Sequence, residues 1–192
     1  MGDFISDAIF EAGKANNSDF AFVNWGMIRI DWPIGNLTYY NLFETIPFDD
    51  QICSFEATGA ELIKIMEVLQ CSNNYFYPVS NFKQVFSLNP KTLKSISFYD
   101  GTEIIQEKTY RIVTTDFVVN GGDDFSKVLT FFTPRNKIEH GGTRDNVGAY
   151  VKKLGILNSI DKPIVHPEKP RIAIEGTRIS RKFLERFEEI RK

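Results

Sequence analysis

The stretch from Asn24 to Arg29 carries two side chains that are well suited to holding a ligand. It places an amide and a planar guanidinium five residues apart, on either side of Gly26. The amide of Asn24 offers both donors and an acceptor. The guanidinium of Arg29 has the shape that recognises a phosphate or a carboxylate. These residue types therefore predict a binding loop for a polar, anionic ligand.

A second loop and two phenylalanines extend this prediction. Gly121 and Gly122 allow the backbone to approach a ligand closely, and the Asp123 carboxylate beside them accepts hydrogen bonds, as sugar hydroxyls require. Phe117 precedes this loop by four residues, and Phe48 follows a proline that fixes the chain. Taken singly, these features also describe an ordinary turn and ordinary core side chains, so the prediction depends on their combination.

The sequence offers little for catalysis. Its two histidines, His140 and His166, have no His or Cys partner three or four residues away, which zinc sites usually provide. Both are interpreted as solvent-exposed loop residues. No Gly-x-Ser-x-Gly elbow supports a serine nucleophile. We therefore expect no metal site, no cofactor and no catalytic residue on this chain.

Composition indicates a globular protein and argues against several partner classes. The 192 residues suit one domain with an appendage, 42% of them are hydrophobic, and the formal net charge is −2. Neither a basic face for nucleic acid nor an apolar stretch of membrane-spanning length is present. Residues 1–12 lack the basic start of a signal peptide, which leaves the compartment open. Cys53 and Cys71 are too few for a disulfide framework, although a single bond between them stays open.

Helices and strands are mixed without a regular alternation, which predicts an α+β fold with mixed sheet layers and flanking helices. Thr58 and Glu61 form a capping box at the start of one helix. The first half of the chain predicts a helix over 3–13, a strand over 21–23, a helix from Thr38 to Leu42, a strand over 51–55 and the helix that follows Thr58.

The second half begins with strand-like patterns, and Asp100-Gly101 predicts a hairpin turn between the last two of them. Asp145 is expected to cap a helix that Gly155 ends. The expected segments are strands over 75–79, 83–88, 93–99 and 109–115, a helix over 146–154, a connector over 158–171 and an amphipathic helix over 177–190. We expect a domain over 1–176 and a C-terminal helical extension over 177–192 that docks on a protein partner.

In order along the chain, seven stretches resemble motifs of the C-terminal domain of the 5′-nucleotidase family, which includes UDP-sugar hydrolases and ecto-5′-nucleotidases. The resemblance covers about residues 2–176. Two of the family's motifs are an NGGGIR loop and a Y-x-V-x-T-(N/D)-F run that ends in GGDG. The matching stretches are Gly2 to Ala8, Asn24 to Arg29, Gly35 to Leu42, Pro47 to Asp50, Thr58 to Leu62, Pro78 to Asn81 and Tyr110 to Asp124.

This resemblance implies a role for each candidate residue. In the family, two phenylalanine rings clamp the nucleobase, and the matching positions are Phe48 and Phe117. The base-contacting asparagine corresponds to Asn24, the phosphate-facing arginine to Arg29, and the ribose-binding aspartate to Asp123. The ligand is then a nucleotide or nucleoside. Hydrolysis would belong to a separate metallophosphoesterase domain with a pair of divalent metals, in the parent chain or in a partner.

The sequence departs from the family pattern at several glycines. Trp25 and Met27 replace two glycines of the NGGGIR loop, Asn81 replaces the glycine of a QVSG motif, and Asp124 replaces the last glycine of GGDG. Such glycines serve close backbone approach and positive φ angles. Trp25 is therefore expected to take up ligand space, and Asp124 to add negative charge near a polyanion. Asp3 also replaces a family asparagine.

Three hypotheses follow from these observations. The leading one is the substrate-binding domain of a 5′-nucleotidase-type enzyme that is inactive without its metal-binding half. The second is a degenerate copy that serves as a structural or interaction module in a larger assembly. The third is a free-standing nucleotide binder that performs no hydrolysis.

Overall fold

The computed structural model describes residues 1–72, 76–88, 90–155 and 171–174. Its centre is a five-stranded sheet in the order β3-β1-β6-β2-β7, in which β1 runs parallel to β6 and the other neighbours are antiparallel. The strands are β1 (Phe20–Phe22), β2 (Gln51–Thr58), β3 (Val79–Ser80), β6 (Thr109–Thr115) and β7 (Arg135–Gly142).

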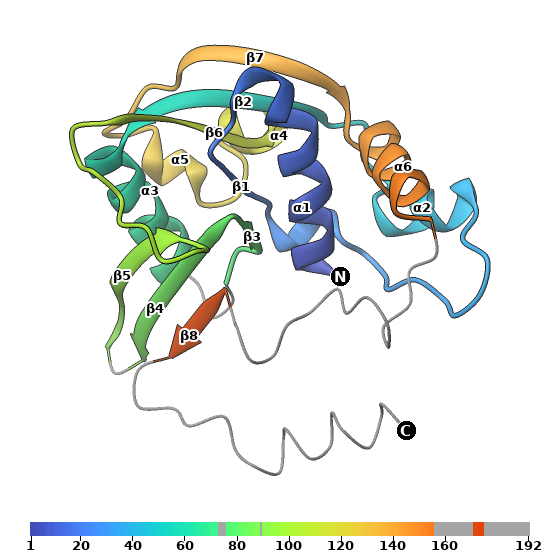
Figure 1. The fold of residues 1–192 in the computed structure, drawn as a ribbon, viewed down its shortest axis with the longest axis horizontal. Helices are drawn as coiled ribbons and strands as arrows, with labels where there is room; N and C mark the ends of the chain where they lie inside the picture. The colour runs from blue at the N-terminus through green and yellow to red at the C-terminus, as the bar shows by residue number, and fades with distance from the viewer. Residues whose placement is uncertain (73–75, 89, 156–170, 175–192) are drawn as a thin grey trace.

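Helices cover both faces of this sheet. One face is covered by α1 (Gly2–Gly13), α2 (Tyr39–Thr45) and α6 (Thr143–Leu154), and the other by α3 (Gly59–Cys71) and α5 (Phe125–Val128). Figure 1 shows the two groups of helices on opposite sides of the sheet. Along β1, Phe20 and Phe22 point towards α3, whereas Ala21 points towards α1. The central strands are therefore buried on both sides.

A smaller sheet, in the order β5-β4-β8, completes the α+β fold. It contains β4 (Phe82–Leu88), β5 (Lys91–Phe98) and β8 (Ile172–Ile174). Phe82 stacks on Phe20 with ring centroids 4.0 Å apart, and this contact joins the two sheets in one core. The remaining helical turns are α4 (Asp116–Val119), η1 (Lys14–Asn16) and η2 (Trp25–Met27). No helix within the described residues has the length and apolar character needed to cross a bilayer.

The helix predictions for the first half of the chain are confirmed. The predicted apolar face of α1, which includes Phe4, Ile5 and Ile9, is buried. Both Thr38 and Thr58 form complete capping boxes, in which the threonine hydroxyl and the side chain three residues later each bind a backbone amide. These boxes satisfy amides that have no partner within their own helix, and they fix where α2 and α3 begin.

Three predictions for the second half are wrong. The turn at Asp100-Gly101 exists, but β5 pairs with β4, and β6 lies in the other sheet. Of residues 76–79, the described part of the predicted strand 75–79, only Val79 enters a strand, because the backbone of Tyr77 binds the side chain of Gln70 instead. The last described helix begins at Thr143 with Gly142 as its N-cap, so Asp145 lies in its first turn and caps nothing.

Two strands were not predicted at all. β7 is an edge strand with a largely exposed, polar sequence, and β8 lies where a connector over 158–171 was expected to end. The rest of that connector and the predicted helix over 177–190 lie outside the described residues. Cys53 is buried, Cys71 is partly buried, and the two are not bonded to each other.

Candidate functional site

A cavity of about 210 Å³ lies at one end of the central sheet, and all five predicted ligand residues line it. They come from three separate parts of the chain: the loop after β1, the segment before β2 and the segment after β6. The lining residues are Asn24, Gly26, Met27, Arg29, Phe48, Asp50, Phe117 and Asp123. The fold therefore brings together side chains that are up to 99 residues apart in the sequence.

The two phenyl rings are positioned by the ends of neighbouring strands. β2 and β6 are paired with Ile52 opposite Thr115, so Phe48 and Phe117 both lie just beyond the last rung of the same ladder. Asp116 ties the two segments together, because its Oδ1 accepts hydrogen bonds from the backbone amides of Gln51, at 2.9 Å, and Phe117, at 2.8 Å. Phe48 and Phe117 remain 41% and 45% exposed, which leaves both rings available to a ligand.

Asn24 and Asp123 form the polar wall of the cavity. The Nδ2 of Asn24 donates to Oδ2 of Asp123 at 2.8 Å. Asn24 is buried, and its Oδ1 has no hydrogen-bond partner within the described part of the protein. An unpaired buried acceptor costs about 1–3 kcal/mol, so it favours any ligand that donates to it. Asp123 is exposed and adopts a φ of +47°, a conformation that aspartate tolerates better than most residues.

Arg29 is an exposed residue that lines the cavity. Its Nη1 donates to the carbonyl of Gly26 at 3.1 Å, and its guanidinium lies 5.8 Å from the centre of the Phe48 ring. Within the described residues, this guanidinium has no carboxylate partner. An exposed guanidinium that is not neutralised suits an anionic group of a ligand.

The glycine replacements have milder consequences than expected. Trp25 does not line the cavity, and its ring instead lies against the start of α1, where Cη2 is 3.0 Å from the position that a Cβ on Gly2 would take. The prediction that Trp25 takes up ligand space is therefore wrong. Asn81 adopts a φ of +61° without a glycine, and its side chain donates to the carbonyl of Asp19 at 2.9 Å. Asp124 pairs with Lys127 at 2.7 Å, outside the cavity lining.

Asp50 lines the cavity but was not singled out from the sequence. It lies two residues after Phe48, and its backbone carbonyl accepts hydrogen bonds from Thr143. Its side chain has no hydrogen-bond or ion-pair partner among the residues that the structure describes. Burial, and secondly the nearby Asp116 carboxylate, raises the pKa of Asp50. The signal in the sequence was its place beside Phe48 at the start of a strand.

The sequence matches the family model of the 5′-nucleotidase, C-terminal domain, over residues 1–130. That match covers more than half of the 192-residue chain. The chain belongs to this family.

Two curated relatives and one solved structure agree with this assignment. The domain is 30% identical over 140 residues to the cell wall protein Lmo0130 of Listeria monocytogenes serovar 1/2a, a match that covers 66% of this chain and 18% of that protein. It is 25% identical over 154 residues to an apyrase of Tabanus yao, covering 67% and 27% of the two chains. Its fold resembles that of a 5′-nucleotidase precursor from Thermus thermophilus, with a TM-score of 0.75, 23% identity and coverage of 92% and 35%. The chain therefore spans less than a third of these curated relatives.

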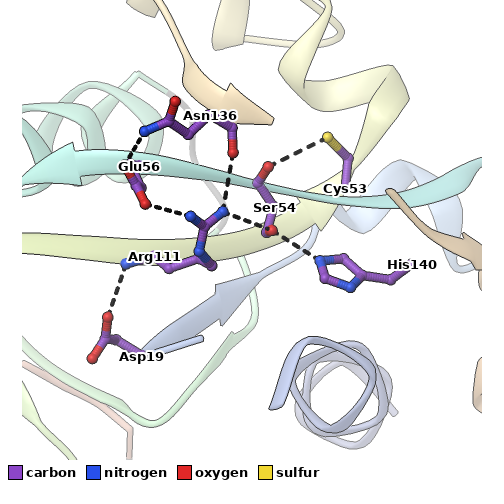
Figure 2. Close-up of polar contacts among 7 residues, drawn as sticks. All are labelled: Asp19, Cys53, Ser54, Glu56, Arg111, Asn136 and His140. Atoms are coloured by element: carbon purple, nitrogen blue, oxygen red, sulfur yellow. Dashed lines mark hydrogen bonds and ion pairs between the residues drawn. The ribbon is translucent and has the colours of Figure 1, made fainter. Parts of the chain in front are cut away.

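A polar cluster on the central sheet contains the one described histidine (Figure 2). The Nε2 of His140 lies 2.8 Å from the hydroxyl of Ser54, so the prediction of a solvent-exposed loop histidine is wrong for this residue. His166 lies outside the described residues. Arg111 binds Glu56 and approaches the same hydroxyl at 3.5 Å. Ser54 is completely buried, so this pair cannot meet a substrate.

Within the described residues, no group of three or more His, Cys, Asp or Glu side chains is placed to hold a metal ion.

This cluster predicts a loss of stability in mild acid. Burial, and then the charge of Arg111, lowers the pKa of His140, so the folded protein favours the neutral ring. The stabilisation is complete above the unfolded pKa of about 6.5 and is lost as the pH falls through the folded value. We expect the free energy of unfolding of the wild type to fall more than that of His140→Gln between about pH 7.5 and 5. Urea denaturation at both pH values measures the difference, and parallel curves would contradict the assignment.

Gly122 is predicted to hold the Phe117 ring in place. A Cβ at Gly122 would lie 2.4 Å from Cε1 of Phe117 and 2.6 Å from its carbonyl oxygen. Gly122→Ala must therefore push the ring or its backbone aside, at a cost of about 1–3 kcal/mol in stability and with weaker ligand binding. Gly148→Ala is the matched control, because its Cβ meets only Leu42 at 3.4 Å. Thermal denaturation and ligand titration of both variants test this, and equal behaviour would refute it.

Proposed function

We propose that this chain binds the nucleoside part of a substrate for a nucleotide-hydrolysing phosphoesterase. The observation that carries the proposal is the cavity in which two half-exposed phenyl rings meet an amide, a carboxylate and an arginine. Stacking of a base on an aromatic ring contributes about 1–3 kcal/mol, and two rings can contact both faces of a flat heterocycle. The family assignment and a relative named apyrase are consistent with nucleotide chemistry.

Each of the five predicted ligand residues has a part in this proposal. Phe48 and Phe117 stack on the base, and Asn24 donates to or accepts from a polar group of the ligand near them. Asp123 accepts hydrogen bonds from the ribose hydroxyls, since a carboxylate only accepts. Arg29 faces the phosphate. This arrangement binds and orients a nucleotide and leaves the phosphate at the open side of the cavity.

Hydrolysis is assigned to a metallophosphoesterase domain, in the parent chain or in a partner, with a pair of divalent metals. Metal ions supply an activated water and neutralise the phosphate charge in such reactions. On this proposal the 192-residue chain releases no phosphate from nucleoside monophosphates with Mg²⁺, Mn²⁺, Zn²⁺ or Ca²⁺. A colorimetric phosphate assay checks this, and turnover that co-purifies with the chain through several columns would contradict it.

The binding proposal is tested by calorimetric titration of the chain with purine nucleosides and their 5′-monophosphates. We expect saturable binding of both, with tighter binding of the monophosphates because Arg29 then gains a partner. Heat from neither class of ligand would reject nucleotide recognition.

A specific observation favours the second candidate function, an interaction module. Five large apolar side chains between residues 30 and 43 are 45% exposed or more, and they follow the site loop directly: Ile30, Ile34, Tyr39, Tyr40 and Phe43. A cluster of this kind marks a surface that another protein or domain covers. If the titrations give no nucleoside binding, the interaction module becomes the leading hypothesis for the function of this chain. A pull-down with the wild type then tests it, and unlabelled Tyr40→Ser and Ile34→Ser variants should compete less well for the captured partner than unlabelled wild type.

A further inference from the structure

Asp50 lines the same cavity as the two phenyl rings. β2 and β6 pair antiparallel from Thr58 opposite Thr109 to Ile52 opposite Thr115. The ladder ends there, because Phe117 already belongs to the helical turn α4 and Asp50 precedes β2. Asp50 follows Phe48 by two residues on the same segment, and it lines the cavity together with both phenyl rings. On the proposed function, a base held by these rings therefore shares the cavity with the Asp50 carboxylate.

The Asp50 carboxylate is unsatisfied and short of nearby positive charge. Its neighbour Asp116 already accepts two backbone hydrogen bonds, whereas no donor within the described residues reaches the side chain of Asp50. The charged side chains that line the same cavity are Arg29 and Asp123, and Asp123 already binds Asn24. The carboxylate is partly buried and has no donor from the described residues, so a ligand that supplies N–H groups can satisfy it.

We propose that Asp50 makes the site selective for guanine nucleosides. This inference rests on the proposed function, because it requires the base to lie between Phe48 and Phe117. A carboxylate offers two acceptors and no donor. The edge of guanine presents two adjacent donors, N1–H and the N2 amino group, which match both oxygens at once. Adenine presents a lone pair at N1, which faces a carboxylate unfavourably, and hypoxanthine supplies only the N1–H donor.

The size of the preference follows from the cost of a mismatched polar contact. A bidentate pair between a side chain and a base discriminates by about 1–3 kcal/mol, and each 1.36 kcal/mol is a factor of ten. We therefore expect guanosine to bind about 10-fold or more tightly than adenosine, with inosine between the two.

The test is calorimetric titration of the full 192-residue chain with guanosine, inosine and adenosine, at about pH 8 to keep the carboxyl group ionised. Asp50→Asn should lose the preference for guanosine, because its amide can donate to N1 of adenine and accept from the N6 amino group. Asp49→Asn is the matched control: Asp49 lies next to Asp50, pairs with Arg144 and does not line this cavity. This variant should keep the preference.

The outcomes separate the two proposals. Binding of no purine nucleoside by the wild type rejects the proposed function and this inference together. Adenosine that binds as tightly as guanosine, with binding lost in Phe117→Ala, overturns the guanine assignment alone. A guanosine preference that survives in Asp50→Asn assigns the selectivity to another residue and overturns the role of Asp50. If Asp50→Asn does not fold, the ratio of guanosine to inosine affinity in the wild type still decides, and equal affinities would contradict the two-donor contact.

Discussion

Phe117→Ala is expected to weaken purine nucleoside binding about 10-fold or more. The ring is 45% exposed at the cavity wall, and loss of one stacking face removes about 1–3 kcal/mol of binding free energy. Because the side chain is only partly buried, its removal should cost the fold little compared with truncation of a core phenylalanine. Titration calorimetry of wild type and variant, with far-UV circular dichroism to confirm folding, measures the effect.

Phe131→Ala supplies the control for this variant. Phe131 is 38% exposed, lies outside the cavity lining and contacts Lys64 at 4.2 Å from its ring centre. The same atoms are therefore removed from a comparable surface without touching the ligand. If Phe117→Ala kept the wild-type affinity, or if Phe131→Ala lost as much affinity as Phe117→Ala, the ligand would not bind in the proposed cavity.

Arg171→Met is expected to lower the free energy of unfolding by about 3 kcal/mol, the usual cost of breaking a largely buried ion pair from one side. Arg171 contacts Asp7 at 2.7 Å and donates to the carbonyl of Val79 at 2.7 Å, and its side chain is 18% exposed. The same Asp7 accepts from Ser80 at 2.5 Å. The residue thus joins α1 to β3 and to β8. Methionine keeps the length of the stem but removes the charge and the donors.

A second ion pair shows what a surface contact should contribute. Arg135 pairs with Glu61, and this contact lowers the pKa of Glu61 to about 2, yet the Arg135 side chain is 46% exposed. Solvent screens such a pair, so Arg135→Met should cost only about 0–1 kcal/mol. Urea denaturation of both variants gives the comparison. Equal losses would mean that Arg171 acts as an ordinary surface residue.

The elements that could be predicted are those with strong local signals. The apolar face of α1 and the capping boxes at Thr38 and Thr58 are determined by residues three or four positions apart in the sequence. The structure contains all of them as expected. β7 lacked such a signal because an exposed edge strand has a polar sequence without alternation. The turn predicted at Asp100-Gly101 forms and is followed by a bridge between Ser97 and Glu103, but the pairing of β5 with β6 expected across it does not occur. A turn fixes its own geometry but does not fix which strands pair: β5 pairs with β4, the strand just before it, and β6 pairs with β2.

The site residues were likewise predictable where the sequence carried a local motif and not where their position depended on tertiary structure. Family motifs identified Phe48, Phe117 and Asp123, and the structure brings all of them to one cavity. Asp50 was missed because its place in the site comes from the tertiary fold, which brings it into one cavity with Phe117 from a distant part of the chain. The expected clash at Trp25 was wrong because the direction of a side chain within a 3₁₀ turn depends on tertiary packing, here against the start of α1.

Nucleotide recognition by this domain requires a base to lie between Phe48 and Phe117, and a crystal structure of the chain grown with a purine nucleoside tests this directly. We predict electron density for the base between the two phenyl rings, with the ribose beside Asp123 and one polar edge of the base facing Asp50. A nucleoside bound elsewhere, or a cavity closed by contact of the two rings at saturating ligand, would contradict nucleotide recognition by this domain.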